Sequence, residues 1–175
     1  MKIINNKKDA IQELKRIANR TNSENNNKVI AIVEEILQEV KNNGDLAVEK
    51  YTRKFDGFNP EPMHISPENL KDAWDEIDSD LKRSLEVAHQ RIKKFHEKEI
   101  PTSFTLKGEH GDIVQRQWRP VKNAGIYIPG GRAAYPSTVL MNAIPATVAG
   151  VKEIIMVSPG DTEGNINKTV LAAAH

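Results

Sequence analysis

The stretch from Ala124 to Val157, AGIYIPGGRAAYPSTVLMNAIPATVAGVKEIIMV, decides the fold that this sequence predicts. It opens with a short apolar run, Ala124–Ile128, which stops at Pro129-Gly130-Gly131. It closes with a second apolar run, Glu153–Val157, of the kind found in parallel strands that are covered on both faces. Because parallel strands need a long crossover, usually a helix, the stretch predicts one strand, turn, helix and strand unit.

The helix of this unit is indicated by a long segment without charge. No Asp, Glu, Lys or Arg occurs between Arg132 and Lys152, which is typical of a helix buried on most sides. A membrane span needs about 20 mostly apolar residues. Pro136 and Asn142, among other residues, interrupt the segment, so we do not expect one.

The ends of this helix are predicted from its caps. Ser137 or Thr138 is the expected N-cap, since a hydroxyl there can accept a hydrogen bond from the first main-chain N–H groups. Gly150 is the expected C-terminal stop. A further helix is expected to begin near Asn165–Asn167, so another strand and helix repeat has started when the sequence stops. We therefore expect an incomplete fold.

The sequence before this unit falls into two parts. Up to about residue 100 it is charged and poor in glycine and proline, and apolar residues recur at helical spacing. Helices are predicted at Lys7–Ala18, Asn26–Asn42, from Asp45 with Ala47, Tyr51 and Phe55 buried, from Ser66, and over Ser79–Lys98. The narrow apolar stripe of the last helix fits a coiled-coil seam or, as we prefer, an ordinary helix packed along one side.

From Pro101 the residues favour β structure, and Gly108 and Gly111 predict a hairpin. The sequence thus predicts an α/β fold with a helical appendage. The expected domains are a helical region over residues 1–100 and, over residues 101–175, a hairpin followed by the first part of a nucleotide-binding domain.

The composition excludes several classes of protein. The 175 residues include no cysteine, so there is no disulfide framework, thiolate zinc site or cysteine nucleophile. The formal charge of +1 argues against a nucleic-acid partner, because such proteins usually carry a net basic surface. Residues Met1–Asn6 lead directly into charged sequence without the apolar core of a secretory signal, so we expect a cytoplasmic protein that does not bind membranes.

The turn after the first predicted strand is the main candidate for chemistry. In open α/β sheets ligands bind beyond the carboxyl ends of the strands. Gly130 and Gly131 would let a phosphate approach the backbone, and Tyr127 offers a flat surface for a nucleobase or nicotinamide ring. The same residues fit equally well a tight turn whose glycines take positive φ while Tyr127 packs in the core.

Other candidate sites are weaker. The five histidines do not have a metal-binding spacing, and His110 most simply belongs to a hairpin tip. Arg116, Arg119 and Lys122 around Trp118 could bind phosphate, but as alternating strand residues facing water they need no ligand. We therefore predict no metal ligand among the histidines.

Several segments together resemble the histidinol dehydrogenase family. They are Arg119–Val121, Gly125–Gly131, Tyr135–Ala146 and Val148–Val151. The glycine turn joined to the PSTVLM helix is specific, and the helical part, with Gly44-Asp45 and Tyr51–Asp56, is similar as well. The resemblance covers essentially the whole chain, but only the first part of a family member.

The resemblance implies an NAD-dependent, zinc-containing homodimer. It implies oxidation of L-histidinol through L-histidinal to L-histidine with two NAD, the last steps of histidine biosynthesis, on incomplete Rossmann-like units distantly similar to aldehyde dehydrogenases. Tyr127 matches the family's NAD-contacting tyrosine, and Pro129, Gly130 and Gly131 are its backbone neighbours. The family's zinc ligands and acid/base pair match no position here, so no catalytic or metal residue is assigned.

Two consequences follow from this resemblance. The chain by itself is expected to be catalytically incomplete. The alternatives are a non-catalytic nucleotide-binding or subunit-interaction module, and a structural fragment that pairs only with its missing half. A partial sheet leaves an open edge and an unburied helix face, so association or poor solubility is expected as well.

Overall fold

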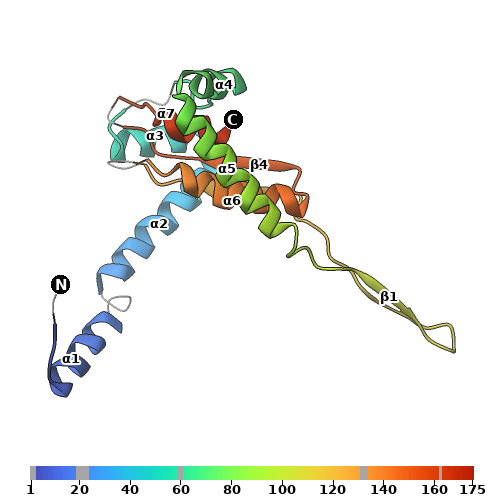
Figure 1. Cartoon of the computed structure of the whole chain (residues 1–175). Coiled ribbons are helices and arrows are strands. Elements are labelled where there is room, and N and C mark those ends of the chain that lie inside the picture. Colours follow the sequence, from blue (N-terminus) through green and yellow to red (C-terminus); the bar gives the residue numbers. More distant parts are fainter. Residues whose placement is uncertain (1–2, 19–23, 59–60, 131–133, 162) are drawn as a thin grey trace. The chain divides into compact units, whose positions relative to one another are not determined.

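The computed structural model describes residues 3–18, 24–58, 61–130, 134–161 and 163–175. Its elements run in the order α1 (Lys7–Ala18), α2 (Glu24–Asn43), α3 (Asp45–Phe55), α4 (Pro67–Glu76), α5 (Ser79–His96), β1 (Phe104–Lys107), β2 (Ile113–Arg116), β3 (Asn123–Tyr127), α6 (Pro136–Ala149), β4 (Glu153–Val157) and α7 (Lys168–Ala174) (Figure 1). The α/β class is confirmed. The chain divides into two compact units, Met1–Phe55 and Asp56–His175.

The first unit contains α1, α2 and α3. Ala47 and Tyr51 are buried where α3 packs on α2, as predicted. The Tyr51 hydroxyl donates to Glu39 at 2.6 Å, which raises the pKa of Tyr51 to about 12. Hydrogen bonds from Lys50 and Tyr51 lower the pKa of Glu39. The prediction that Phe55 is buried was wrong: it lies in the last turn of α3, 57% exposed, and stacks on the Tyr51 ring.

The second unit is built on a two-stranded parallel sheet. β3 and β4 pair in register from Asn123 opposite Glu153 to Tyr127 opposite Val157. α6 and α7 pack together against one face of this sheet, where Ile128, Val139 and Val170 form a buried cluster with the partly buried Ile126 and Met156. The predicted strand, turn, helix and strand unit is therefore present. Both helices that follow the strands cover the same face.

The helices α4 and α5 form an outer layer on α7 and α6. Leu85 of α5 is buried against Leu140 and Ile144 of α6, so the narrow stripe of α5 is that of an ordinary helix packed along one side. By contacts, α4 and α5 therefore group with the sheet, because the apolar partners of α5 lie far along the chain, where local patterns do not show them. The two domains expected over residues 1–100 and 101–175 stay a prediction.

The start of α6 differs from the prediction. Its N-cap is Tyr135, which makes no side-chain capping bond, so the assignment to Ser137 or Thr138 was wrong. Pro136 is the physical reason, because its fixed φ suits the first helical position and starts the helix before the hydroxyl residues. The stop at Gly150 is confirmed, with φ of 90°. Among the described residues, no helix combines the length and apolarity needed to cross a membrane.

β1 and β2 form the predicted hairpin, which extends as an arm within the second unit (Figure 1). Its turn is closed by the Gly108 N–H, which donates to the Asp112 carbonyl at 2.8 Å, and Gly111 takes a φ of 86° there. At the other end, the Trp118 N–H donates to the Ser103 hydroxyl at 2.9 Å. All residues of the two strands are exposed.

Candidate nucleotide site at the strand ends

The carboxyl ends of β3 and β4 lie side by side. The Ile128 N–H donates to the Val157 carbonyl at 2.9 Å, so the pairing continues one residue beyond β3. Pro129 has no N–H with which to continue the hydrogen bonding between the strands. The segments after β3 and after β4 both leave the sheet here. The edge of the sheet is thus formed by Ile128-Pro129-Gly130 and Ser158-Pro159-Gly160, where an open α/β sheet binds ligands.

Tyr127 lies on the sheet face opposite α6 and α7. Its side chain is 63% exposed, and its neighbours on that face, Ile155 and Val157, are 54% and 55% exposed. Strand alternation explains this, because Ile126 and Ile128 on either side point into the covered face. The interpretation of Tyr127 as a core residue was therefore wrong. Its ring is open at the strand end.

Gly130 is explained by a close approach of two backbones. It does not have a positive φ, so the expected positive-φ turn was wrong at this position. A Cβ at Gly130 would lie 2.5 Å from the Pro159 carbonyl oxygen and 2.7 Å from its Cγ. Pro129 beside it is exposed. Gly131, the fourth predicted residue, lies outside the described residues.

The loop after β4 continues the strand-end edge beyond Gly160. This loop was not identified from the sequence as part of the candidate site. The Asp161 carboxylate accepts hydrogen bonds from the N–H groups of Asn165 and Glu163, both at 2.9 Å, and these lower the pKa of Asp161. Gly164, at φ of 84°, lies so close to Phe58 that a Cβ would be 2.9 Å from the ring. The sequence did carry a signal for this loop: Asp161, Gly164 and Asn165 have the spacing of a turn in which an Asp side chain accepts hydrogen bonds from the main chain.

The N-terminus of α6 follows the same glycine turn. Its first N–H groups receive no side-chain cap, and such groups together with the helix dipole favour an anion. An exposed aromatic ring, a strand-end edge and an uncapped helix therefore occur along one short segment. These features fit a nucleotide, with its ring against Tyr127 and its phosphates toward α6.

The described residues offer no comparable site for a metal ion. Within the described ranges, no group of three or more His, Cys, Asp or Glu side chains could hold one. We therefore derive no chemical step through zinc from these residues.

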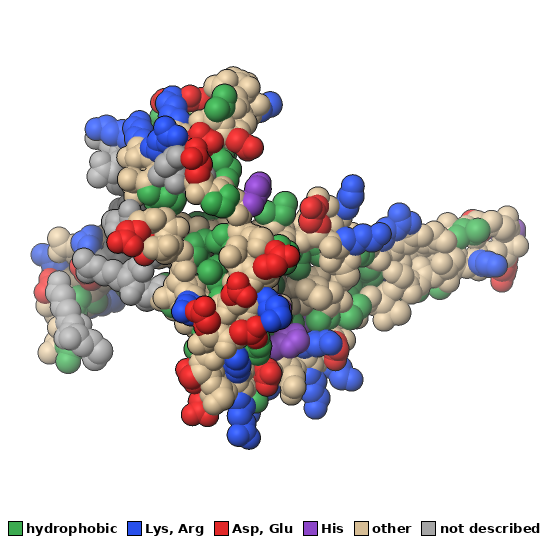
Figure 2. Space-filling model, turned by 90° about the horizontal axis from the view of Figure 1, so that it is seen from above, with side chains coloured by type: hydrophobic (Ala, Val, Ile, Leu, Met, Phe, Trp, Pro, Cys, Tyr) green, Lys and Arg blue, Asp and Glu red, His purple; other side chains and the backbone are tan. Residues whose placement is uncertain are grey.

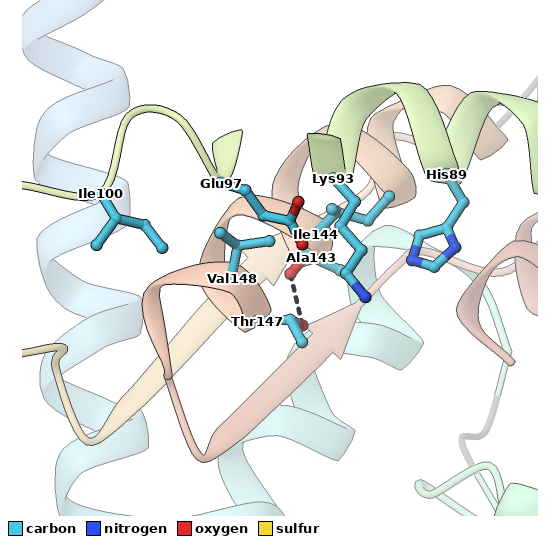
Figure 3. A pocket seen from close by; sticks show the side chains of 8 residues that line it. All are labelled: His89, Lys93, Glu97, Ile100, Ala143, Ile144, Thr147 and Val148. Carbon is cyan, nitrogen blue, oxygen red and sulfur yellow. Dashed lines mark hydrogen bonds between the residues drawn. The ribbon is translucent and has the colours of Figure 1, made fainter. Parts of the chain in front are cut away.

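A separate pocket of about 380 Å³ lies between α5 and α6 (Figure 3). His89 and Lys93 of α5 and Glu97, which follows it, line one side, and apolar side chains of α6 form the other. The Thr147 hydroxyl beside them donates to the Ala143 carbonyl at 2.9 Å. The pocket shares no residue with the strand-end edge, so the strand end remains the candidate site.

Comparison with known proteins now decides the family. The sequence model of the histidinol dehydrogenase family matches residues 19–175. The chain belongs to the histidinol dehydrogenase family. It is 85% identical over its full length to the histidinol dehydrogenase of Prochlorococcus marinus strain MIT 9312, of which it covers 40%, and 73% identical to that of strain CCMP1986, of which it covers 41%.

A solved structure of the same family shows the same fold. The crystal structure of histidinol dehydrogenase from Elizabethkingia anophelis aligns with a TM-score of 0.77 at 36% identity, over 83% of this chain and 34% of that one. This chain thus spans about two fifths of the length of the curated relatives that it matches. The family assignment made from the glycine turn and the PSTVLM helix is confirmed.

Proposed function

We propose that these 175 residues supply the NAD-contacting strand end of a histidinol dehydrogenase. The whole enzyme would oxidise L-histidinol through L-histidinal to L-histidine with two NAD, the last steps of histidine biosynthesis. The observation that carries this proposal is the full-length 85% identity to a histidinol dehydrogenase. Its other parts are a zinc ion held by residues beyond this chain, a cytoplasmic homodimer, and a Rossmann-like unit related to that of aldehyde dehydrogenases.

The position of the helices supports a nucleotide at the end of β3. α6 and α7 cover the same face of the sheet, so the chain adds its strands in one direction, from β3 to β4. The other edge of β3 is left without a neighbouring strand in this pair. That free edge is where strand order can reverse, and ligands bind open α/β sheets at such points. Gly130 and the open Tyr127 ring lie at the carboxyl end of β3, where such a ligand would bind.

Each residue then has a separate task. Tyr127 offers its ring as a stacking surface, Pro129 ends the strand pairing, and Gly130 allows the two strand-end segments to approach. Gly131 would admit the phosphates by its lack of a side chain, as the sequence predicts. NAD supplies the hydride acceptor when bound, and these residues only bind and orient it.

The 175 residues alone are proposed to be inactive, since oxidation of an alcohol needs a placed base and a held substrate. The test compares the isolated chain with a chimera in which it replaces the matched part of the MIT 9312 relative. We expect histidinol-dependent NADH formation from the chimera and none from the isolated chain. Activity of the isolated chain, or an inactive but folded chimera, would contradict the proposal.

The role of Tyr127 is tested in the same chimera. Tyr127→Ala should raise the KM for NAD about tenfold, because stacking of a base on an aromatic ring contributes roughly 1–3 kcal/mol. Its melting temperature should hardly change, since the ring is exposed. Phe55→Ala, which removes another exposed aromatic ring, is the matched control and should leave the KM unchanged. An unaltered KM in Tyr127→Ala would remove this residue from the site.

A further inference from the structure

Asp161 lies just beyond the carboxyl end of β4, beside the turn that follows β3. The segment Ser158-Pro159-Gly160 leads from β4 to this residue. Because a Cβ at Gly130 would lie 2.5 Å from the Pro159 carbonyl oxygen, the segments that leave the two strands are in contact. Asp161 is exposed. An acidic side chain is therefore held next to the turn at which the phosphates of a nucleotide would lie.

The loop fixes the position of this carboxylate. Its Oδ1 accepts hydrogen bonds from the N–H groups of Asn165 and Glu163, and these bonds lower the pKa of Asp161 and keep it ionised at neutral pH. The main chain closes the same turn, since the Asp161 N–H donates to the Asn165 carbonyl and the Gly164 N–H donates to the Asp161 carbonyl, both at 2.9 Å. Both side-chain bonds use Oδ1, so Oδ2 can accept a hydrogen bond from a ligand.

A carboxylate beside the glycine turn of an open α/β sheet has a general use. Where a dinucleotide crosses the strand ends, its pyrophosphate lies at the turn after the first strand, and an acidic residue roughly 20 residues further on binds the ribose 2′-hydroxyl. Hydroxyl groups form short, strong hydrogen bonds with ionised carboxylates. Asp161 is further than this from Gly130 along the chain, so it is the contact between the two segments that relates the carboxylate to the turn.

We propose that Asp161 accepts hydrogen bonds from the adenosine ribose of NAD and that its charge excludes NADP. The proposal rests on the proposed function, which places NAD at these strand ends. NADP carries a phosphate on the 2′ oxygen of that ribose, and this phosphate would meet the carboxylate as a like charge. The sequence from Ser158 to Asn167 contains no Arg or Lys that could pair with such a phosphate. Lys168, the next residue, is already paired with Glu76.

The charge of the chain as a whole does not explain a preference of this kind. The formal net charge is +1, and Figure 2 shows acidic and basic side chains side by side over much of the visible surface. Charges at more than a Debye length from the ligand are largely screened at physiological salt. Discrimination against a single additional phosphate therefore depends on the charges that lie next to it.

The test measures the binding of NAD and of NADP to the chimera by isothermal titration calorimetry, which does not depend on turnover. The parent chimera should bind NAD at least about tenfold more tightly than NADP, and Asp161→Asn should reduce this preference about tenfold, because it removes the charge. An Asn side chain can still accept the main-chain hydrogen bonds of the turn. Asp161→Ser, which keeps a shorter and uncharged acceptor, should change the preference in the same direction.

Glu163→Gln is the matched control for the charge of the loop. It removes another carboxylate from the same loop and keeps the main-chain N–H that donates to Asp161. The preference for NAD over NADP should stay as it is in the parent chimera. If Glu163→Gln reduces the preference as much as Asp161→Asn does, the discrimination does not belong to Asp161.

The outcomes separate this proposal from a merely structural role and from the proposed function. An equal loss of affinity for NAD and NADP in both Asp161 variants would show that the residue only shapes the loop, and would overturn the proposal. A parent chimera that shows no preference, or that binds neither dinucleotide, would overturn it as well. An inactive chimera in which Asp161 sets the preference would contradict only the proposed function, and an active chimera whose preference does not depend on Asp161 would contradict only this proposal.

Discussion

In the described part of the second unit there are two sheets of two strands each, and their surroundings differ completely. The parallel pair β3–β4 has one face covered by α6 and α7, with Ile128 0% exposed. The antiparallel pair β1–β2 has no buried residue, although it is rich in apolar side chains. Strand pairing alone is therefore not what stabilises either sheet here. The parallel pair depends on its helices, whereas no described residue buries the apolar face of the hairpin.

The exposed residues of the two sheets also suit different kinds of binding partner. On β3–β4 the open face carries Tyr127 at a strand end beside a glycine turn, which suits a small planar ligand. On β1–β2 the open face is a stripe of separate apolar side chains along an arm, which suits an extended surface. Changes in the two sheets should therefore give different kinds of effect.

The largest effect is expected from truncation in the covered face of the parallel pair. Ile128→Ala should lower the free energy of unfolding by about 3 kcal/mol, because it leaves a cavity beside Val139 and Val170. Val114→Ala in the hairpin should lower it by less than about 0.5 kcal/mol at protein concentrations where no association occurs. Urea unfolding followed by circular dichroism measures both. Equal losses in the free energy of unfolding would contradict the view that only the parallel sheet is stabilised by burial.

A smaller loss is expected from Gly130→Ala. The new Cβ would lie 2.5 Å from the Pro159 carbonyl, so one strand-end segment must shift, at a cost of about 2 kcal/mol. Gly125→Ala, in the strand just before this turn, is the matched control, since its Cβ would meet nothing within 4 Å. Thermal unfolding of both variants checks this. Similar melting temperatures would show that the two segments approach less closely than the structure has them.

These contrasts also show how far the sequence could lead. The parallel unit was predictable because its apolar runs and glycine turn are local signals, and the hairpin because of Gly108 and Gly111. The start of α6 was not, because Pro136 competes with two hydroxyl residues that follow it. The grouping of α4 and α5 with the sheet was not predictable either, since it depends on contacts between distant segments.

The candidate site was predictable only in part. The sequence identified Tyr127 and the turn, but left open whether the ring is buried or exposed, which depends on which sheet face the helices cover. Of its two explanations for Gly130, the positive φ was wrong, and the close approach of Pro159 could not be foreseen because it comes from a segment beyond α6. Asp161 was missed although the Asp, Gly and Asn spacing of its turn is present in the sequence, because such turns are common in loops and do not by themselves indicate a ligand site.

A pH-dependent effect is expected at the loop that joins β4 to α7. The folded state lowers the pKa of Asp161, so its carboxylate contributes stability that is complete above its ordinary pKa near 4 and is lost as pH falls through the lowered value. Asp161→Asn should lower the urea midpoint at pH 7 by less than Gly130→Ala does, and by the same amount at pH 6.

This difference between Asp161→Asn and the parent chain should shrink below about pH 4, as the parent carboxylate takes up its proton. Glu163→Gln keeps the main-chain N–H that Asp161 accepts and should leave the midpoint at pH 7 almost unchanged. A difference that grows on acidification would have the opposite sign and would exclude the carboxylate as the stabilising group.

The smallest effect is expected in the hairpin, from Arg116→Ala. Its guanidinium lies 4.9 Å from the Trp118 ring, and an exposed contact of this kind contributes about 0.5 kcal/mol. Because opening of the arm is local, hydrogen exchange of its amides should rise roughly twofold while exchange in β3 and β4 stays the same. Arg119→Ala is the control, since Arg119 donates to Gln117 instead. If exchange rises in both sheets together, the arm does not open independently, and the two sheets share one stability.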